Sequence, residues 1–350
     1  MSVMISFRLG RFCSLMLMVI GICVWIPKAS MAQLNPKESQ LLGAWNDCAT
    51  KRALVAYVQR VCDPKSVDFV PEPERIAVFD NDGTLWPENP IPFQLAYAFD
   101  VVGKRASNDP EFAKHPMVQA VLKKDTATLL AGDHHEGLLQ VVAMTHAGMS
   151  VEEFQKSVSD WIAQATHPKY NMPYDRLTYK PMQEVLSYLR SNGFKTYIVS
   201  GGGADFMRVW SERVYGIVPE QVIGSSAKTK FEFRDGKPVL IKTLDQLFVD
   251  DKAGKPVGIH QAIGRRPIVC FGNSDGDMAM LQYTTIGNPR RAFGAIVHHT
   301  DEVREYAYDA TPKSSGKLIE ALADAPKQGW YVIDMKQDWA EVWATEPARK

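Results

Sequence analysis

The sequence lacks an excess of charge of either sign. Forty lysine and arginine residues match forty aspartate and glutamate residues, so the formal net charge is zero. Without a basic surplus the composition does not favour binding to nucleic acid, and without a polybasic block it does not favour an anionic membrane surface. Internal repeats and low-complexity tracts are also lacking. At 350 residues and 45% hydrophobic, the chain is long enough for one large globular unit or two domains.

Cysteine is scarce, and its positions argue against a disulfide. Outside the N-terminal segment the chain has only Cys48, Cys62 and Cys270. A predicted helix that begins near Thr50 and ends at Cys62 separates the first two by about 15–20 Å, at 1.5 Å per residue. A disulfide needs Cα atoms within about 7 Å, so we expect none here unless the helix breaks near Ala49. Cys270 lies in an apolar strand and is expected to be inert and buried.

Long apolar runs are absent except near the N-terminus. Residues 12–26 form an apolar stretch that follows two arginines and is short for a membrane span. The small residues Ser30 and Ala32 occupy the −3 and −1 positions of a predicted signal-peptidase cleavage site between Ala32 and Gln33. This pattern predicts a signal peptide over residues 1–32 and a periplasmic or secreted protein without stable membrane association after cleavage. An uncleaved N-terminal anchor is the alternative.

The remaining chain alternates apolar strands with helical patterns. Continuous apolar runs at 75–79, 195–200 and 267–271 predict strands that are buried on both faces. Residues 87–179 are mostly helical in pattern, and residues 230–241 read as a hairpin with an Asp-Gly turn. Strands that alternate with helices predict an α/β fold with a parallel sheet, whose ligands lie beyond the carboxyl ends of the strands.

The first of these strands ends in two acids. Asp80 and Asp82 are two residues apart, so in extended geometry they face the same side, and Gly83 allows a sharp turn after them. Two close carboxylates repel unless a cation lies between them or one binds a proton. An oxygen site of this kind suits Mg²⁺. The alternative is a strand end with two solvated acids and ordinary turn chemistry.

The next two candidate sites offer groups that bind anions. Ser200 ends the second strand, and Gly201, Gly202 and a third glycine follow it before a helix. Backbone amides at a helix start attract phosphate, but a tight strand-to-helix turn is an equal reading. The spacing is not that of a dinucleotide-binding loop. Lys255, at the start of a short helix, is a second phosphate candidate, with Lys252 as its rival, although an ordinary exposed lysine is the favoured reading from this segment alone.

The third strand leads into a loop rich in oxygen-bearing side chains. Asn273, Asp275 and Asp277 follow it in the sequence "GNSDGD". A calcium-binding loop is the competing reading, but the spacing lacks the glutamate at position twelve of an EF-hand.

Taken in order, these segments resemble the haloacid dehalogenase superfamily, in its phosphoserine-phosphatase-like branch and among its exported bacterial members. The resemblance covers residues 75–287 and rests on four motifs: "FDNDGT", "YIVSGGG", Lys255 and "CFGNSDGDMAML". It implies a Rossmann-like α/β core with a helical cap inserted after the first strand motif and a small β-hairpin flap. The implied boundaries are 33–86 and 180–350 for the core and 87–179 for the cap.

The resemblance also implies a role for each matched residue. Asp80 would be the nucleophile and Asp82 the proton donor and acceptor of an Mg²⁺-dependent phosphatase. Phosphate would be held by Ser200, Gly201, Gly202 and Lys255. The metal would be held by Asp80, Asp82, Asn273 and Asp277, with Asp275 as a rival. Relatives usually carry aspartate where this chain has Asn273, so this ligand is uncharged.

The substrate is not identified by these motifs beyond a small-molecule phosphomonoester. Glu88 stands one position from the glutamate that phosphoserine-specific relatives use. Four aromatic residues could form a cage for a cationic ligand such as phosphocholine, but core packing is the favoured reading: Trp86, Trp161, Tyr170 and Tyr174. The pairs His134-His135 and His298-His299 are interpreted as surface or cap residues rather than metal ligands. A non-catalytic periplasmic binding protein of the same fold remains the alternative function.

Overall fold

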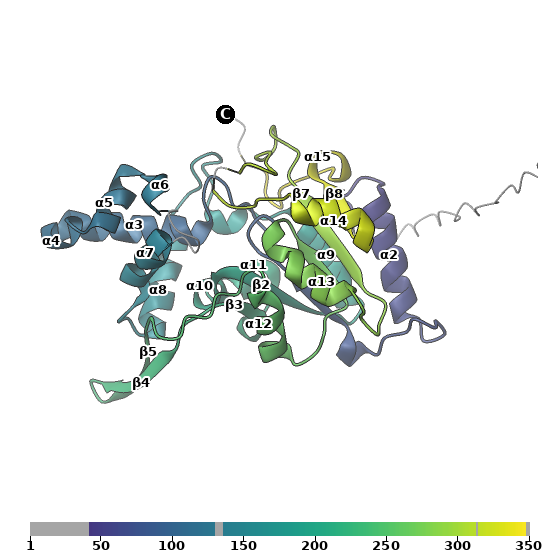
Figure 1. The fold of residues 1–350 in the computed structure, drawn as a ribbon, viewed down its shortest axis with the longest axis horizontal. Helices are drawn as coiled ribbons and strands as arrows, with labels where there is room; N and C mark the ends of the chain where they lie inside the picture. Colours follow the sequence, from purple (N-terminus) through teal and green to yellow (C-terminus); the bar gives the residue numbers. More distant parts are fainter. Residues whose placement is uncertain (1–41, 130–135, 313, 348–350) are drawn as a thin grey trace, which may run out of the picture. The chain divides into compact units, whose positions relative to one another are not determined.

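The structure is a computed structural model that describes residues 42–129, 136–312 and 314–347, so the predicted signal segment lies outside the described residues. Its main sheet has six strands in the order β3-β2-β1-β6-β7-β8, and every neighbouring pair is parallel (Figure 1). The strands are β1 (Ile76–Phe79), β2 (Lys195–Gly203), β3 (Val222–Ser225), β6 (Val269–Gly272), β7 (Phe293–His298) and β8 (Tyr331–Asp334). The predicted α/β class with a parallel sheet is confirmed.

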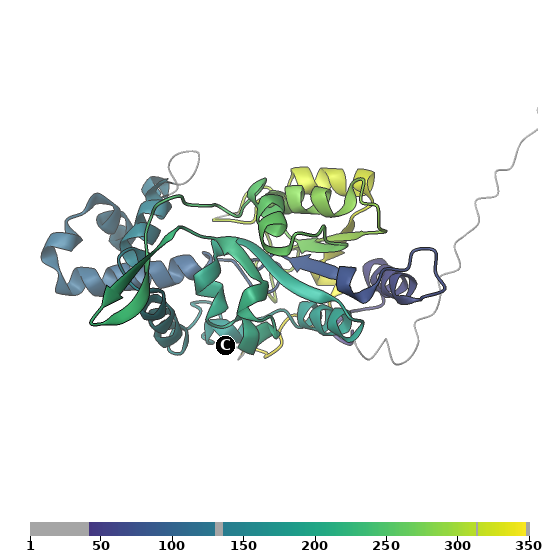
Figure 2. The same ribbon diagram turned by 90° about the horizontal axis from the view of Figure 1, so that it is seen from below.

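Strand β1 is buried on both faces, because its side chains alternate between two apolar clusters. Ile76 and Val78 pack in one cluster, and Ala77 and Phe79 in the other. The first cluster is covered by α12 (Gly254–Ile263), α13 (Met278–Thr285) and α14 (Glu320–Gln328). The second is covered by α2 (Ala49–Cys62) and α9 (Lys180–Ser191) (Figure 2). This central position holds the end of β1 rigidly.

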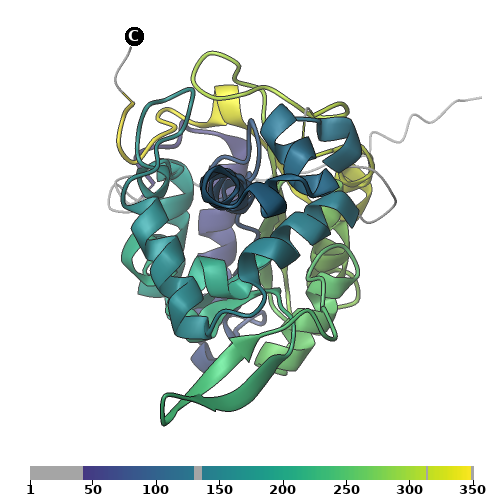
Figure 3. The same cartoon turned by 90° about the vertical axis from the view of Figure 1, so that its left-hand side faces the viewer.

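A helical insertion follows the first motif. It contains α3 (Phe93–Asn108), α4 (Pro110–Ala113), α5 (Pro116–Lys123), α6 (Thr126–Leu129), α7 (Glu136–His146) and α8 (Val151–Ile162) (Figure 3). Part of the insertion has its own apolar cluster, which includes Val102, Val118 and Val141. Helix α8 begins with the predicted capping box, in which Ser150 and Glu153 exchange side-chain to backbone hydrogen bonds.

The predicted hairpin consists of β4 (Thr229–Arg234) and β5 (Lys237–Lys242), paired antiparallel. Asp235 and Gly236 form its turn, and both have positive φ (49° and 74°), as a two-residue hairpin turn requires. The end of β5 is joined to the helical insertion. The amide of Lys242 donates to Met149 O at 2.9 Å, and the amide of Gly148 donates to Lys242 O at 3.0 Å.

The structure differs from the sequence prediction in three respects. Strands β3, β7 and β8 were not predicted. Strand β2 continues through the three glycines to Gly203 instead of ending at Ser200, with a register shift against β3 between these residues. The single helix expected after the glycines is divided into α10 (Ala204–Arg208) and α11 (Ser211–Tyr215). The remaining short elements are η1 (Glu72–Glu74), η2 (Tyr174–Arg176), η3 (Pro219–Gln221), η4 (Asp275–Asp277) and α15 (Met335–Asp338).

The three cysteines outside the predicted signal segment are free. Cys48 caps the N-terminus of α2 and Cys62 ends the same helix, as the helical prediction required, and Cys270 is buried in β6. Within the described parts of the chain, no helix is both long enough and apolar enough to cross a membrane.

Candidate active site

The carboxyl ends of β1, β2 and β6 meet at one edge of the sheet, because β1 pairs with both of the others. A cavity of about 1240 Å³ lies there. The core contributes the ends of these strands, and the helical insertion contributes residues such as Gln94, Val142 and His146. The predicted residues that line this cavity are Asp80, Asp82, Ser200, Gly201, Gly202, Lys255, Asp275 and Asp277. The structure therefore brings the separate motifs together.

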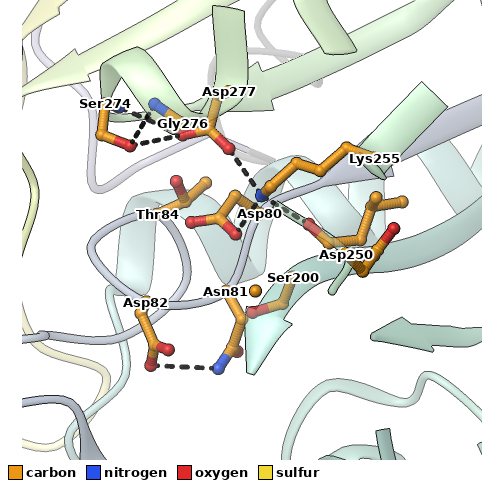
Figure 4. Close-up of polar contacts among 12 residues, drawn as sticks. Asp80, Asn81, Asp82, Thr84, Ser200, Asp250, Lys255, Ser274, Gly276 and Asp277 are labelled. Carbon is orange, nitrogen blue, oxygen red and sulfur yellow. Dashed lines mark hydrogen bonds and ion pairs between the residues drawn. The ribbon is translucent and has the colours of Figure 1, made fainter. Parts of the chain in front are cut away.

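Lys255 holds the predicted nucleophile (Figure 4). Its ammonium group lies 2.6 Å from Asp80 Oδ1 and 2.6 Å from Asp277 Oδ1, and it donates to Val199 O at 2.9 Å. Lysine has three N–H donors, so three protein acceptors engage them all. The short helix α12 positions this lysine, whose side chain is only 2% exposed.

These buried charges do not balance. Burial and the nearby Asp277 carboxylate raise the pKa of Asp80 well above its usual range, and Lys255 opposes this. Burial disfavours the Lys255 ammonium, but the two carboxylates outweigh it and raise the pKa of the lysine. Two buried acids thus face one base, with Asp82 in the same cavity. A divalent cation would stabilise this surplus of carboxylates and favour the ionised form of Asp80.

Asp82 has different surroundings. Its Oδ1 accepts a hydrogen bond from the Trp86 indole at 2.5 Å. Burial raises the pKa of Asp82 to about 6, although this hydrogen bond acts in the opposite direction. A carboxyl group with a pKa near neutrality both donates and accepts protons efficiently. The predicted sharp turn follows it, with Gly83 at a φ of 78°.

The glycine-rich end of β2 is held by its own neighbours. Ser200 is 1% exposed, and its Oγ accepts from the amide of Gly202 at 3.1 Å. The amide of Gly203 donates to Gln94 Oε1 at 2.6 Å, which joins this strand end to helix α3. Sequence reasoning missed Gln94, because an ordinary glutamine in an amphipathic helix carries no signal.

In the loop after β6, Asn273 is turned toward the first motif. Its Oδ1 accepts from Thr84 Oγ1 at 3.3 Å, and its Nδ2 donates to Glu88 Oε1 at 2.7 Å. Asn273 is 2% exposed. The amide of Asn273 therefore lies beside the first motif, although Asn273 is not among the described residues that line the cavity, and its role as a ligand stays a prediction.

The two aspartates of the same loop have other partners. Asp277 Oδ1 binds Lys255, and its Oδ2 accepts from the amides of Asn273 and Ser274 at 2.9 and 3.1 Å. Asp275 Oδ1 accepts from the amides of Ile319 and Ala321, both at 3.0 Å. Asp277 thus shapes the loop and positions the lysine, and Asp275 binds the start of α14.

Glu88 belongs to this site in a way that the sequence did not indicate. It is 3% exposed and lines the cavity. Besides the Asn273 amide, its Oε1 accepts from Tyr308 Oη at 2.8 Å. Burial raises the pKa of Glu88 to about 7. The sequence placed Glu88 one position from the glutamate of phosphoserine-specific relatives, and nothing in it pointed to the contact with Asn273.

His299 is not the surface residue that the sequence suggested. It is 2% exposed, and its Nε2 donates to the carbonyl of Gly83 at 2.7 Å, while its Nδ1 lies 3.1 Å from Glu305 Oε2. It therefore supports the turn after Asp82. The interpretation failed because His299 directly follows the unpredicted strand β7. His134 and His135 lie outside the described residues.

The four aromatic residues considered as a cage for a cation are part of the core. Trp86, Trp161, Tyr170 and Tyr174 are at most 8% exposed and belong to one apolar cluster. None is among the described residues that line the cavity. Their packing includes Trp86 against Trp210, with ring centroids 4.1 Å apart. The core-packing interpretation is confirmed.

The donors at this site fit a hard cation better than a transition metal. In the described residues, no group of three His, Cys, Asp or Glu side chains is arranged to hold a metal ion. The candidates are a carboxylate (Asp80), an amide oxygen (Asn273) and the main-chain carbonyl of Asp82, all of them oxygen donors. Mg²⁺ is held in proteins by few carboxylates together with carbonyls, waters and substrate phosphate, so these residues fit Mg²⁺.

Comparison with known proteins identifies a family. A model of the haloacid dehalogenase-like hydrolases matches residues 77–282. A search of curated proteins found no match.

Among solved structures, similar chains have low identity to this one. A functionally unknown protein from Anaerococcus prevotii DSM 20548 is 16% identical, with 80% of this chain and 98% of that chain covered and a TM-score of 0.49. A protein of unknown function from Bordetella pertussis Tohama I is 16% identical, with 75% and 99% covered and a TM-score of 0.45. A phosphoserine phosphohydrolase-like protein from Francisella tularensis SCHU S4 is 16% identical, with 65% and 89% covered and a TM-score of 0.38. Similarities this low carry no inference about the substrate of this chain.

Proposed function

Because the chain belongs to the haloacid dehalogenase-like hydrolases, we propose that it is an Mg²⁺-dependent phosphomonoester hydrolase that acts on a small phosphorylated metabolite. The observation that carries the proposal is the arrangement around Asp80. Lys255 holds one oxygen of this carboxylate at 2.6 Å, and Asp82, whose pKa is near neutrality, lies in the same cavity. A fixed nucleophile beside a proton donor is what transfer of a phosphoryl group requires.

In the first step, an oxygen of Asp80 attacks phosphorus and the bond to the leaving oxygen breaks. Asp82 gives its proton to this oxygen, which departs as an alcohol and leaves Asp80 phosphorylated. In the second step, Asp82 takes a proton from water, and the water oxygen attacks the same phosphorus. The bond between phosphorus and Asp80 breaks, inorganic phosphate leaves, and both aspartates return to their starting states.

The remaining residues hold the phosphoryl group and the nucleophile. Lys255 keeps Asp80 in place and offers positive charge beside the reacting phosphorus. The Ser200 hydroxyl and the amide of Gly201 would bind the phosphoryl oxygens from the end of β2, while the amide of Gly202 donates to Ser200 Oγ and fixes this hydroxyl. Mg²⁺, bound by Asp80, the Asp82 carbonyl and Asn273, would supply positive charge that neutralises the transferring group.

The rest of the cavity indicates the character of the leaving group. Apolar side chains line it on the side of the helical insertion and the hairpin, among them Leu138, Val142, Phe154, Leu244 and Leu247. The basic residue Lys242, which also lines it, is paired with Asp205. A small phosphomonoester with a partly apolar leaving group fits these walls.

Hydrolysis of p-nitrophenyl phosphate tests the proposal. We expect purified protein to release p-nitrophenol with added Mg²⁺, and Asp80→Asn to abolish turnover because the amide is a poor nucleophile. Asp235→Asn in the exposed hairpin turn removes the same charge at a residue outside the cavity lining and should leave turnover unchanged. Full activity of Asp80→Asn would overturn the proposed mechanism.

A non-catalytic phosphate-ester-binding protein is the second candidate. The uncharged Asn273 favours it, because an amide holds a cation less strongly than a carboxylate does. Binding of phosphomonoesters without turnover of any member of a broad panel would support this function and exclude the first.

A further inference from the structure

We propose that Glu88 is part of the metal site and supplies the carboxylate that the loop after β6 lacks. This inference rests on the proposed function, because it concerns the Mg²⁺ ion of that same site. The carboxylate is supplied by a different position of the chain from the one that relatives use. It stands on the segment after the first motif, while the loop position holds an amide, Asn273.

The contact between the two side chains is direct and buried. Glu88 Oε1 lies 2.7 Å from Asn273 Nδ2, and the two residues are 3% and 2% exposed. Tyr308 donates to the same Glu88 oxygen at 2.8 Å and so helps to fix the carboxylate. This arrangement spans 185 positions of sequence, so it is a tertiary contact made at the site.

The pair lies against the backbone of the first motif. A Cβ atom on Gly83 would lie 2.1 Å from Asn273 Nδ2 and 2.5 Å from Glu88 Oε1. Only a glycine leaves room for this approach. Gly83 directly follows Asp82, whose carbonyl is a proposed ligand, so Glu88 and Asn273 lie beside the part of the backbone that would bind the cation.

The chemistry of the contact determines how Asn273 is oriented. An ionised carboxylate only accepts hydrogen bonds, so the amide must turn its Nδ2 toward Glu88. The amide oxygen then points the other way, where it accepts from Thr84 Oγ1 at 3.3 Å. Glu88 therefore presents the oxygen of Asn273, and not its nitrogen, to the cation. Partners that orient a ligand in this way tune both its geometry and its affinity.

Glu88 also restores the missing charge. Its two hydrogen-bond partners described above, Asn273 and Tyr308, are neutral. His299, the basic group nearby, is engaged by Glu305 at 3.1 Å. A buried carboxylate without a bonded cation is costly. A divalent cation beside Asn273 would offset that cost, and the site would again hold the number of acids that relatives have.

Titration calorimetry of Mg²⁺ into the purified full chain tests this assignment. We expect Glu88→Gln to weaken Mg²⁺ binding at least tenfold, because the glutamine keeps the shape and an acceptor oxygen but loses the charge. Asn273→Asp places two carboxylates in contact and should also bind more weakly than wild type. The double variant Glu88→Gln/Asn273→Asp exchanges acid and amide, so its affinity should return to within about threefold of wild type, a strong non-additivity.

Glu184→Gln is the matched control. Glu184 is a partly buried acid on α9 that accepts from the amide of Ala44, away from the cavity lining, so its substitution should leave Mg²⁺ affinity unchanged. Circular dichroism establishes that each variant is folded. If Glu88→Gln does not fold, the comparison of Asn273→Asp with the double variant still decides between the outcomes.

Two results would overturn the assignment. The first is wild-type Mg²⁺ affinity in Glu88→Gln. The second is tighter binding by Asn273→Asp that the added Glu88→Gln does not change. If the wild type binds Mg²⁺ and hydrolyses p-nitrophenyl phosphate, either of these variant results removes this inference and leaves the proposed function in place. Absence of Mg²⁺ binding by the wild type would remove both this inference and the metal dependence of the proposed function.

Discussion

Asp275 and Asn273 lie in the same loop but have different hydrogen-bond partners. The Asp275 carboxylate points at the start of α14, where it accepts two backbone amides, whereas Asn273 points at the first motif. The amides at the start of a helix lack partners within the helix, and a carboxylate there satisfies them and interacts well with the helix dipole. Asp275 thus acts as a cap supplied by a distant segment, which leaves Asn273 as the better candidate for the metal.

Asp275→Ala should therefore lower stability without affecting the metal. We expect the free energy of unfolding in urea to fall by about 1 kcal/mol, the usual cost of a lost cap. Mg²⁺ affinity in calorimetry should change less than twofold. Asp275→Asn keeps an acceptor oxygen and should lose less stability. A tenfold loss of Mg²⁺ affinity in Asp275→Ala would instead make Asp275 the ligand.

At the residue scale, the sequence predicted site residues that directly follow predicted strands. It did not predict residues that reach the site only through tertiary contacts. Asp80 and Ser200 could be placed together because each lies at the end of a predicted strand, and parallel strands end at the same edge. Glu88 and His299 gave no such signal. Glu88 lies in a proline-rich segment without periodicity, and its partner depends on how that segment turns back toward the loop after β6. A pattern of single residues does not contain that information.

Among the elements, α3 and α7 of the helical insertion are linked to β2 by a chain of hydrogen bonds. The amide of Gly203 donates to Gln94 Oε1, so the Gln94 amide nitrogen is left to donate to His146 Nε2 at 3.2 Å. His146 Nδ1 then carries the proton and lies 2.7 Å from Thr145 Oγ1, which donates to Val141 O. This chain requires the neutral imidazole, because a proton on Nε2 would face a second donor.

The pH dependence of stability follows from this requirement. Burial lowers the pKa of His146 from 6.5 to about 3. Between these values the unfolded chain binds the proton and the folded chain does not, so the stabilisation is complete above pH 6.5 and is lost as the pH falls. At pH 5 the loss is about 2 kcal/mol, from 1.36 kcal/mol per pH unit.

Unfolding in urea at pH 7 and pH 5 measures this loss. The stability difference between wild type and His146→Gln should shrink by about 2 kcal/mol at the lower pH. His260→Gln, at an exposed position on α12, should show no such change. Equal acid sensitivity of wild type and His146→Gln would contradict the assignment of the neutral form.

At the element scale, the strongest patterns were predicted and the short elements were not. The runs at β1, β2 and β6 are apolar and end in polar loops, so both type and position were readable. Strands β3 and β8 are as long as β1 and β6, four residues each, but they are not continuous apolar runs, because β3 ends in Gly224-Ser225 and β8 ends in Asp334. The break between α10 and α11 occurs beside Trp210, which is fully buried. The Trp210 ring packs against Trp86 and Tyr215 at this break. The break therefore coincides with a tertiary contact, which the local sequence does not reveal.

At the scale of the whole molecule, we propose that the chain is exported and begins at Gln33 after cleavage. The apolar segment at residues 12–26 and the small residues before position 33 support this proposal. When the full chain is expressed in a bacterium, mild osmotic shock should release the protein, and mass spectrometry should find Gln33 as its first residue. A cytoplasmic protein that retains the segment would contradict the proposal, and a membrane-bound one would indicate an uncleaved anchor.

The order of strands in the sheet also determines when this protein can become active. Strand β1 is central, but its two neighbours begin only at Lys195 and Val269. Asp80 and Lys255 are 175 positions apart in sequence. Pairing over such distances makes folding slow. A growing chain that has not yet reached Lys255 would carry the acids of β1 without their ammonium partner. A chain that ends before β6 is therefore expected to be inactive, because it lacks a neighbour of β1.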